Sequence, residues 1–417
     1  MNREELIRLI SWIYISQTVG SAHGRLLRLW DEYADPLEIC RAFSEKRQSC
    51  TLYEVKNYEG IHKDDVLGII SYCESHNIEI IPFDSHKYPD GLRRISNPPA
   101  VIYCKGRTEI LTESIIVAIV GTRKPSEYSI RATQRIAEAT AQNGITIASG
   151  FAVGTDITAH LAAVHGGGRT VAVLGCGLDY PYPKENVQYI DEILENGVFV
   201  SEYPPETPPN SITFPARNRI LTAISSGTAV MEAARKSGSL NSAAHAISQG
   251  KELFVLPPRD IFDPAYDGNC QLLRDSAIPI CAEDDIVREY FENYSRMPAK
   301  EHMSDLVIID NDPEISPLRS KRIKLSSAKD KQRPNKAGKD KTETPAQDKE
   351  DTKNYPAALD VDNKIIYDII NSAEKPVSIE YISEISGIGV DEVLSAVTDM
   401  ELDGFVSSDD GMNYHIM

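Results

Sequence analysis

Paired cysteines are missing from this chain of 417 residues, whose seven cysteines include no CxxC spacing and are odd in number. They are Cys40, Cys50, Cys73, Cys104, Cys176, Cys270 and Cys281. This usage is typical of thiols in a reducing compartment, not of a disulfide framework or a zinc site. No stretch approaches the roughly 18 apolar residues that a membrane span needs, and the amphipathic start MNREELIRLISWIY is no signal peptide. We therefore expect a cytoplasmic protein without membrane contact.

The motifs of several enzyme classes are absent as well. There is no GxxxxGK[ST] phosphate loop, no GxSxG nucleophile turn and no HExxH zinc site. His160 and His165 are five residues apart, the wrong interval for one helix face, so they are not expected to share a metal ion. Asp156 and His160 form either an acid/base pair or a helix-capping aspartate packed near its own histidine. We expect no catalytic residue and no metal site.

A dinucleotide cofactor is not expected either. Its fingerprint needs three glycines in one turn and an acidic residue about 20 residues later. The turn after Val120 offers only Gly121, and the turn that begins at Gly175 has Tyr180 where the third glycine would stand. The sequence therefore predicts no cofactor.

Positive charge is scarce, because the net charge is −18. A protein that coats nucleic acid with its whole surface is excluded, so any contact with a polyanion must be a local basic patch. One segment differs, since 318–341 holds ten lysines and arginines against two aspartates, a net +8. Without apolar periodicity, 293–358 is predicted to be a disordered basic linker. It is either a solvated tether or a non-specific hold on nucleic acid.

The region 81–292 alternates short β-branched runs with helical segments, which predicts a Rossmann-like α/β domain with a parallel sheet covered on both faces. The expected helices include Ile130–Asn143 and Asn241–Gln249. The expected strands are Ile115–Val120, Ile145–Ala148, Thr170–Leu174, Phe199–Ser201, Thr228–Met231, Leu253–Leu256 and Pro279–Cys281. In such sheets ligands bind beyond the carboxyl ends of the strands.

Two smaller domains are predicted beside it. Residues 1–80 have helical periodicity with a break at Val19-Gly20-Ser21, which predicts a helical (SAM-like) domain. It is a packing module or a nucleic-acid-touching hairpin, the latter supported by His23, Arg25 and Arg28 alone. Residues 359–417 have the pattern of three helices and a β wing, as in winged-helix domains that read DNA. Their net charge of −11 would repel phosphates, so we interpret this acidic domain as a protein-contact module.

Glycines follow the strands where a ligand would bind. Gly121 follows the first expected strand, Gly150 and Gly154 lie in SGFAVGTD, and Gly238 lies in RKSGSL. Glycine at such turns lets backbone N–H groups approach a phosphate. Arginine forks match phosphate oxygens, and aromatic rings stack on bases. The candidates of these two types are Arg123, Arg217, Arg219, Arg235, Phe151 and Phe214. Together they predict a groove for a nucleotide or a polynucleotide.

These residues, in this order, resemble the DNA-processing protein A family (DprA, also called Smf). The resemblance covers about 81–290. It rests on VGTR, SGFAVGTDITAH, VAVLGCGLDYPYPKEN, SEYPP with FPARNRI, and MEAARKSGSL. The chain departs from the family pattern at Ser129, at Pro258 and at Asn241-Ser242, none of which removes a basic residue.

The resemblance implies an extended Rossmann-like domain that binds and protects single-stranded DNA, usually as a homodimer, and helps load the RecA recombinase during natural transformation and recombination. It implies no enzymatic activity. It places Asp156 and His160 in architectural roles. The DNA-binding residues that follow from it and from the glycine turns are Gly121, Thr122, Arg123, Lys124, Gly150, Phe151, Gly154, Lys184, Phe214, Arg217, Asn218, Arg219 and Gly238.

Two alternatives remain open. Gly227-Thr228 followed by Glu232 matches part of the GGxGTxxE motif of phosphoribohydrolases, in which Arg219 and Glu232 would perform the chemistry on a nucleoside monophosphate. However, Ser225-Ser226 replaces the glycines of that motif. The other alternative is a scaffold whose acidic domain and linker recruit partners.

Overall fold

The computed structural model describes residues 2–20, 24–180, 182–210 and 213–293, together with 361–416 except for 373–375, 387, 389–392, 395, 398–399, 401–405 and 409–412. The predicted linker therefore lies outside the described residues, apart from residue 293. So do His23 and most of the expected third helix of the acidic domain. Among the helices that are described, none is long and apolar enough to cross a membrane.

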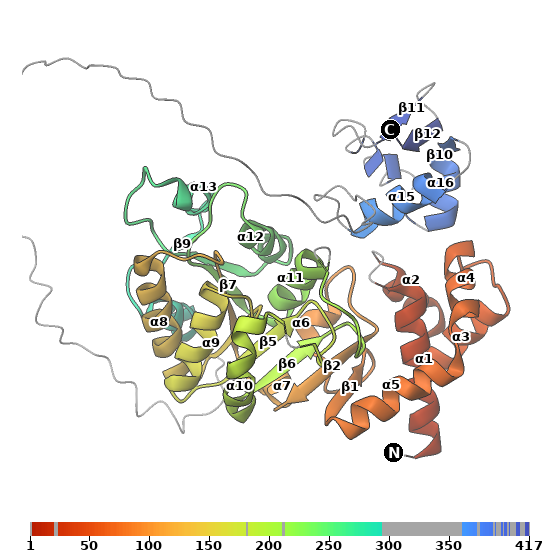
Figure 1. Cartoon of the computed structure of the whole chain (residues 1–417), viewed down its shortest axis with the longest axis horizontal. Coiled ribbons are helices and arrows are strands. Elements are labelled where there is room, and N and C mark those ends of the chain that lie inside the picture. Colours follow the sequence, from red (N-terminus) through yellow and green to blue (C-terminus); the bar gives the residue numbers. More distant parts are fainter. Residues whose placement is uncertain are drawn as a thin grey trace, which may run out of the picture. The chain divides into compact units, whose positions relative to one another are not determined.

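A nine-stranded sheet forms the centre of the fold (Figure 1). Its order is β1-β2-β6-β5-β4-β3-β7-β8-β9. The strands are β1 (Ile78–Pro82), β2 (Val101–Gly106), β3 (Ile116–Val120), β4 (Thr146–Ser149), β5 (Thr170–Leu174), β6 (Gly197–Ser201), β7 (Gly227–Val230), β8 (Glu252–Val255) and β9 (Ile278–Pro279). Strands β3 to β9 pair in parallel, which confirms the predicted parallel sheet. Sequence analysis missed β1 and β2, which add an antiparallel edge.

Helices cover both faces of the sheet because successive strand residues point to opposite sides. Along β3, Val117 and Ile119 belong to one buried cluster and Ile116, Ala118 and Val120 to another. The first cluster includes α8 (Glu127–Gln142), α9 (Thr155–His165) and α14 (Asp285–Asn293). The second includes α11 (Thr213–Ile224) and α12 (Gly238–Ser248). The remaining helical segments of the domain are α6 (Asp90–Arg93), α7 (Ile110–Glu113), η1 (Lys184–Tyr189), α10 (Ile190–Asn196), η2 (Pro264–Tyr266) and α13 (Asp267–Arg274).

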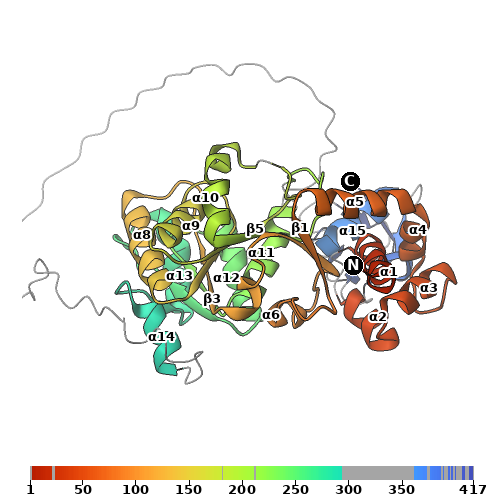
Figure 2. The same ribbon diagram turned by 90° about the horizontal axis from the view of Figure 1, so that it is seen from below.

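Five helices precede the sheet: α1 (Arg3–Val19), α2 (Arg25–Tyr33), α3 (Pro36–Ser44), α4 (Leu52–Gly60) and α5 (Lys63–Ser75). Helix α1 ends at Gly20, whose φ of 61° suits glycine, at the predicted break. Both views show these helices beside β1 (Figures 1 and 2). Trp12 and Trp30 pack against Phe83, next to β1, with ring centroids 6.0 and 5.7 Å away. The helices and the sheet therefore share one core.

Arg25 is one of the three residues that supported a nucleic-acid-touching hairpin for α1 and α2, and the structure does not favour that role. Arg25 is buried and forms two hydrogen bonds of 2.7 Å with the carboxylate of Glu54. A guanidinium that is already paired with a buried carboxylate is not available to a phosphate. Arg28 is exposed. The structure thus favours a packing role for these helices.

The C-terminal domain contains α15 (Val361–Ser372), β10 (Val377–Ser378), α16 (Ile379–Ser386), β11 (Val406–Ser408) and β12 (Asn413–Ile416). The strands pair in the order β10-β12-β11 and form the expected wing. Ile366, Ile370 and Ile382 are buried in it. Five of the acidic residues that contribute to the net charge of this domain, Asp391, Glu392, Asp399, Glu401 and Asp403, lie outside the described residues.

Candidate nucleic-acid interface

The turn after β3 presents Arg123 on a fixed backbone. Thr122 N–H donates to the carbonyl of Glu232 (2.9 Å), and the carbonyl of Thr122 accepts from Thr155 N–H (3.2 Å) and Oγ1 (3.1 Å). Beyond the arginine, Ser126 donates from its N–H (2.9 Å) and Oγ (2.7 Å) to the Glu232 carboxylate. The backbone is therefore held on both sides of Arg123, while the side chain of Arg123 is exposed.

The turn between β4 and α9 packs directly against the first turn. Gly154 has φ 87° and ψ −123°, and a Cβ there would lie 2.7 Å from the carbonyl oxygens of Thr122 and Arg123. Only glycine permits this approach. Asp156 accepts from Ala152 N–H (3.3 Å) and is buried. Burial raises the pKa of Asp156, and nearby Arg217 opposes that shift.

Arg217 reaches the same place from α11. It is 5 % exposed, and its Nη1 donates to the carbonyl of Val173. Its guanidinium lies against Gly150, where any side chain would take its place. Within the described structure its Nε is buried without a hydrogen-bond partner. Burial lowers the pKa of Arg217, Asp156 opposes the shift, and the charge of Arg123 adds to it. Two guanidinium groups close enough for one charge to lower the pKa of the other are suited to bind an anion together.

Arg219 does not join them, which corrects the sequence prediction. It is 3 % exposed and forms an ion pair with the buried Glu202. Residues two apart on a helix point in nearly opposite directions, so Arg217 and Arg219 cannot both face the same groove. The two-residue spacing is visible in the sequence and could have shown that only one of these arginines faces the groove.

Phe151 is a second correction. Its ring is 1 % exposed and packs edge-to-face on Phe199, with centroids 5.1 Å apart. A ring enclosed in this way cannot stack on a base. Its carbonyl instead accepts from Asn186 (2.8 Å), which ties the turn to η1.

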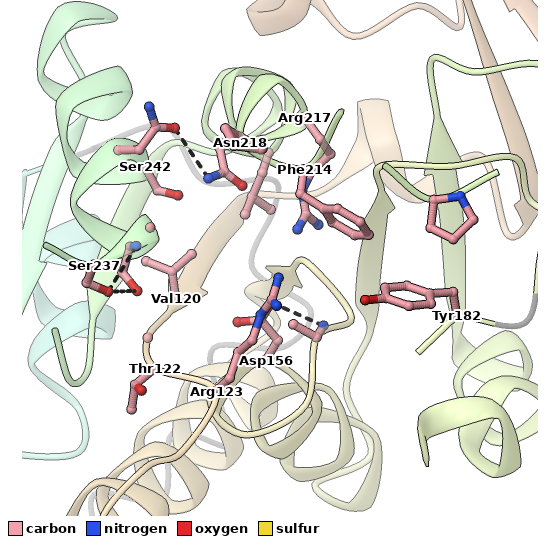
Figure 3. Close-up of a pocket in the computed structure, with 18 of the residues that line it drawn as sticks. Val120, Thr122, Arg123, Asp156, Tyr182, Phe214, Arg217, Asn218, Ser237 and Ser242 are labelled. Carbon is pink, nitrogen blue, oxygen red and sulfur yellow. Dashed lines mark hydrogen bonds between the residues drawn. The ribbon is translucent and has the colours of Figure 1, made fainter. Parts of the chain in front are cut away.

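Two adjoining hollows, together called the groove, lie at the carboxyl ends of the parallel strands. The large hollow measures about 740 Å³ and the small one about 290 Å³. They share Arg123, Ala152, Tyr182 and Phe214. Figure 3 shows Arg123 reaching toward Arg217 and Phe214 of α11, with Ser237 and Ser242 at another wall. Arg123 therefore stands where the hollows meet.

Most of the predicted DNA-binding residues line the groove. The large hollow includes Gly121, Thr122, Arg123, Phe214, Arg217, Asn218 and Gly238. The small hollow adds Gly150 and the exposed Lys184. Lys124 is exposed on the Arg123 turn, and Gly154 supports that turn from behind, but neither lines a hollow. Gly238 is the first residue of α12, so the helix N-terminus, which favours anions, faces the large hollow.

Sequence analysis did not identify Tyr182 as a site residue, although it lines both hollows. Its ring centroid lies 5.4 Å from that of Phe214, at an interplanar angle of 45°. Arg123 lies over the same Phe214 ring, with Cζ 5.9 Å from the centroid. Tyr182 belongs to the motif LDYPYPKEN, but that motif does not show the direction in which the ring points.

The residues required by the phosphoribohydrolase alternative are already bonded elsewhere. Glu232 is 4 % exposed and accepts from Ser126 and from Tyr266 Oη (3.0 Å). Arg219 is paired with Glu202. Neither Arg219 nor Glu232 lines the groove, so the geometry gives this alternative no support. No cluster of potential metal ligands occurs among the residues that the structure describes.

Lowering the pH is expected to destabilise the domain through His160. His160 Nδ1 donates to Thr170 Oγ1 (2.6 Å), because that hydroxyl itself donates to the carbonyl of Ile147. Burial lowers the pKa of His160 from 6.5 to about 3. Between these values the unfolded chain binds a proton that the folded state excludes. The free energy of unfolding therefore falls as the pH falls through this window, by up to about 1.4 kcal/mol per pH unit.

A His160→Gln variant measures this contribution. Its urea midpoint should decrease less than that of the wild type between about pH 7 and about pH 5. Asp156, whose raised pKa acts in the opposite direction, is present in both proteins and cancels in the comparison. Equal decreases in the two proteins would contradict the assignment.

Two family models and several known proteins match this chain. The family model of DNA recombination-mediator protein A matches residues 79–291, and the model of the DprA winged helix domain matches residues 350–412. Protein Smf of Synechocystis sp. is 31% identical over 84% of this chain and 83% of its own length. DNA processing protein DprA of Bacillus subtilis is 36% identical over 53% of this chain and 74% of its own length. The X-ray structure of DNA processing protein A from Streptococcus pneumoniae superposes with a TM-score of 0.59 at 29% identity, over 67% of this chain and 97% of that one.

Proposed function

The chain belongs to the DNA recombination-mediator protein A family, also called DprA or Smf, and on that premise we propose that it binds single-stranded DNA in the groove and delivers it to the RecA recombinase. The process served would be DNA processing in natural transformation and recombination. The protein would act in the cytoplasm as a homodimer, by binding and not by catalysis.

One observation carries the proposal most directly. An exposed arginine, Arg123, stands on a clamped turn where two hollows meet. The guanidinium of Arg217 lies beside it, and among the described residues its Nε has no hydrogen-bond partner. The N-terminus of α12 adds backbone N–H donors at the same sheet edge. Phosphate is the ligand that this donor set fits. An open groove of two connected hollows suits a strand of several nucleotides.

Contacts of this kind predict characteristic binding behaviour. Phosphate contacts carry no sequence information, so affinity should depend little on base sequence and fall steeply with salt. The neutral or acidic surface elsewhere, implied by the net charge of −18, would confine DNA to the groove and to the basic linker.

Arg123→Ala is expected to weaken binding of a labelled oligothymidine strand by about 10- to 150-fold, because a charge-assisted hydrogen bond contributes about 1.5–3 kcal/mol. The slope of log affinity against log salt should also become less steep by about 1, because one phosphate contact is lost. Fluorescence anisotropy titration over a salt series measures both quantities.

Arg131→Ala is the matched control, since Arg131 is an exposed arginine of α8 that does not line the groove. It should bind like the wild type. Equal wild-type affinity for duplex and single strand, or unchanged affinity in Arg123→Ala, would count against the proposal. Release of free base from AMP that Glu232→Ala abolishes would instead support the nucleotide enzyme.

A further inference from the structure

Tyr182 is the exposed aromatic residue at the junction of the two hollows. Its side chain is 36% exposed, and it lines the large and the small hollow together with Arg123 and Phe214. Figure 3 shows its ring entering the groove from the side opposite Arg123, with the hydroxyl end leading. A strand that passes from one hollow to the other must pass this ring.

Phe214, which sequence analysis named as a candidate for stacking on a base, is already in contact with other groups of the groove. Arg123 lies over its ring, 5.9 Å from the centroid. A Cβ built on Gly175 would lie 3.2 Å from Phe214 Cδ1, so the ring also packs against that backbone. The Tyr182 ring also contacts Phe214. Phe214 therefore supports both Arg123 and Tyr182. Of these two rings, Tyr182 is exposed and Phe214 only partly so.

The loop that carries Tyr182 is anchored to the floor of the groove. Asn186 is 2% exposed and donates from Nδ2 to the carbonyl of Phe151 (2.8 Å). Tyr182 N–H donates to the carbonyl of Tyr180 (2.9 Å). These contacts restrain the backbone of the loop, and the Tyr182 ring packs on Phe214. Restraint before DNA arrives reduces the entropy lost on binding.

We propose that Tyr182 stacks on a base of the bound strand and is the residue by which the groove prefers unpaired DNA. This inference rests on the proposed function. In it, Tyr182 makes the contact that selects unpaired DNA, and Arg123 makes a separate contact with phosphate. In a duplex each base is stacked between its neighbours, and exposing its face to Tyr182 requires unstacking. In a single strand the faces are available, and stacking on an aromatic ring contributes about 1–3 kcal/mol per base.

The test uses the full-length protein and two labelled probes, an oligothymidine strand and a strand of equal length whose sugars carry no bases. Tyr182→Ala should weaken binding to oligothymidine by about 5- to 150-fold, without changing the salt slope. It should bind the abasic strand like the wild type. Tyr182→Phe should retain most of the affinity for oligothymidine, because the ring and not the hydroxyl makes the contact.

Tyr180→Ala is the matched control, as Tyr180 is 37% exposed on the same loop but lines neither hollow. It should bind both probes normally. If the wild type binds oligothymidine and Tyr182→Ala binds it equally well, or loses both probes alike, the stacking role is wrong and the proposed function stands. If the wild type itself binds the abasic strand as tightly as oligothymidine, no base is stacked and the inference also fails. If the wild type binds no single strand, the proposed function falls, and the inference with it.

Discussion

Replacing Arg219 by alanine is expected to lower the free energy of unfolding by about 3–5 kcal/mol, because it leaves a buried carboxylate without its counter-charge. The Arg219 and Glu202 side chains are only 4% and 7% exposed. Water therefore cannot solvate Glu202 in place of the guanidinium. Urea unfolding of the full chain, followed by far-ultraviolet circular dichroism, measures the loss as a lower midpoint.

Two further variants make the cause of that loss explicit. Arg219→Met combined with Glu202→Met removes both charges and should recover most of the stability. Arg288→Ala breaks an exposed pair with Asp284 and should cost no more than about 0.5 kcal/mol. If Arg219→Ala unfolds at the wild-type midpoint yet binds DNA poorly, Arg219 contacts DNA as sequence analysis predicted, and its pairing with Glu202 is not its main role.

Gly154→Ala is expected to reduce both stability and DNA affinity. The backbone at Gly154, with φ 87° and ψ −123°, costs a residue with a side chain about 1–3 kcal/mol. The new methyl would also lie 2.7 Å from the carbonyl of Arg123. The turn must move to make room, which displaces Arg123 from the junction of the hollows. We expect at least a tenfold loss of affinity for oligothymidine, since displacement removes a contact of about 1.5–3 kcal/mol.

Gly167→Ala separates these two effects. Gly167 also has a positive φ, of 76°, but a methyl there would meet no atom within 4 Å. It should lose a similar amount of stability and bind DNA normally once folded. If the two variants bind DNA equally, the close approach of Gly154 to Arg123 does not matter for binding. Melting temperatures and anisotropy titrations on both proteins decide the question.

The parallel part of the sheet and its ligand edge were predictable because they rest on local signals. A buried β-branched run that ends in glycine, as at Val120 and Gly121, marks a strand and its turn together. The first expected strand began at Ile115, so the edge strands β1 and β2 were not predicted. The expected domain boundary at residue 80 lies inside β1 (Ile78–Pro82), and this strand pairs with β2 in the antiparallel direction.

Within the site, sequence analysis recognised residue types but not always their direction. Arg123 and Arg217 face the groove, as expected. Phe151 belongs to the same glycine turn, but its ring fills the core beside Phe199, and adjacency in sequence could not show this. Tyr182 was missed because a tyrosine within a proline-rich loop has no periodicity to indicate its surroundings.

The shared core of the five helices and the sheet has a practical consequence for any shortened version of the protein. Cutting the chain at residue 80 would remove Ile78–Ile80 of β1 and leave Tyr103, Cys104 and Lys105 of β2 without their partners in the sheet. Unprotected strands of this kind recruit other chains into aggregates. The same cut would uncover Phe83, which now packs against two tryptophans. The α/β domain should therefore be produced with its helical neighbour attached, as one folding unit.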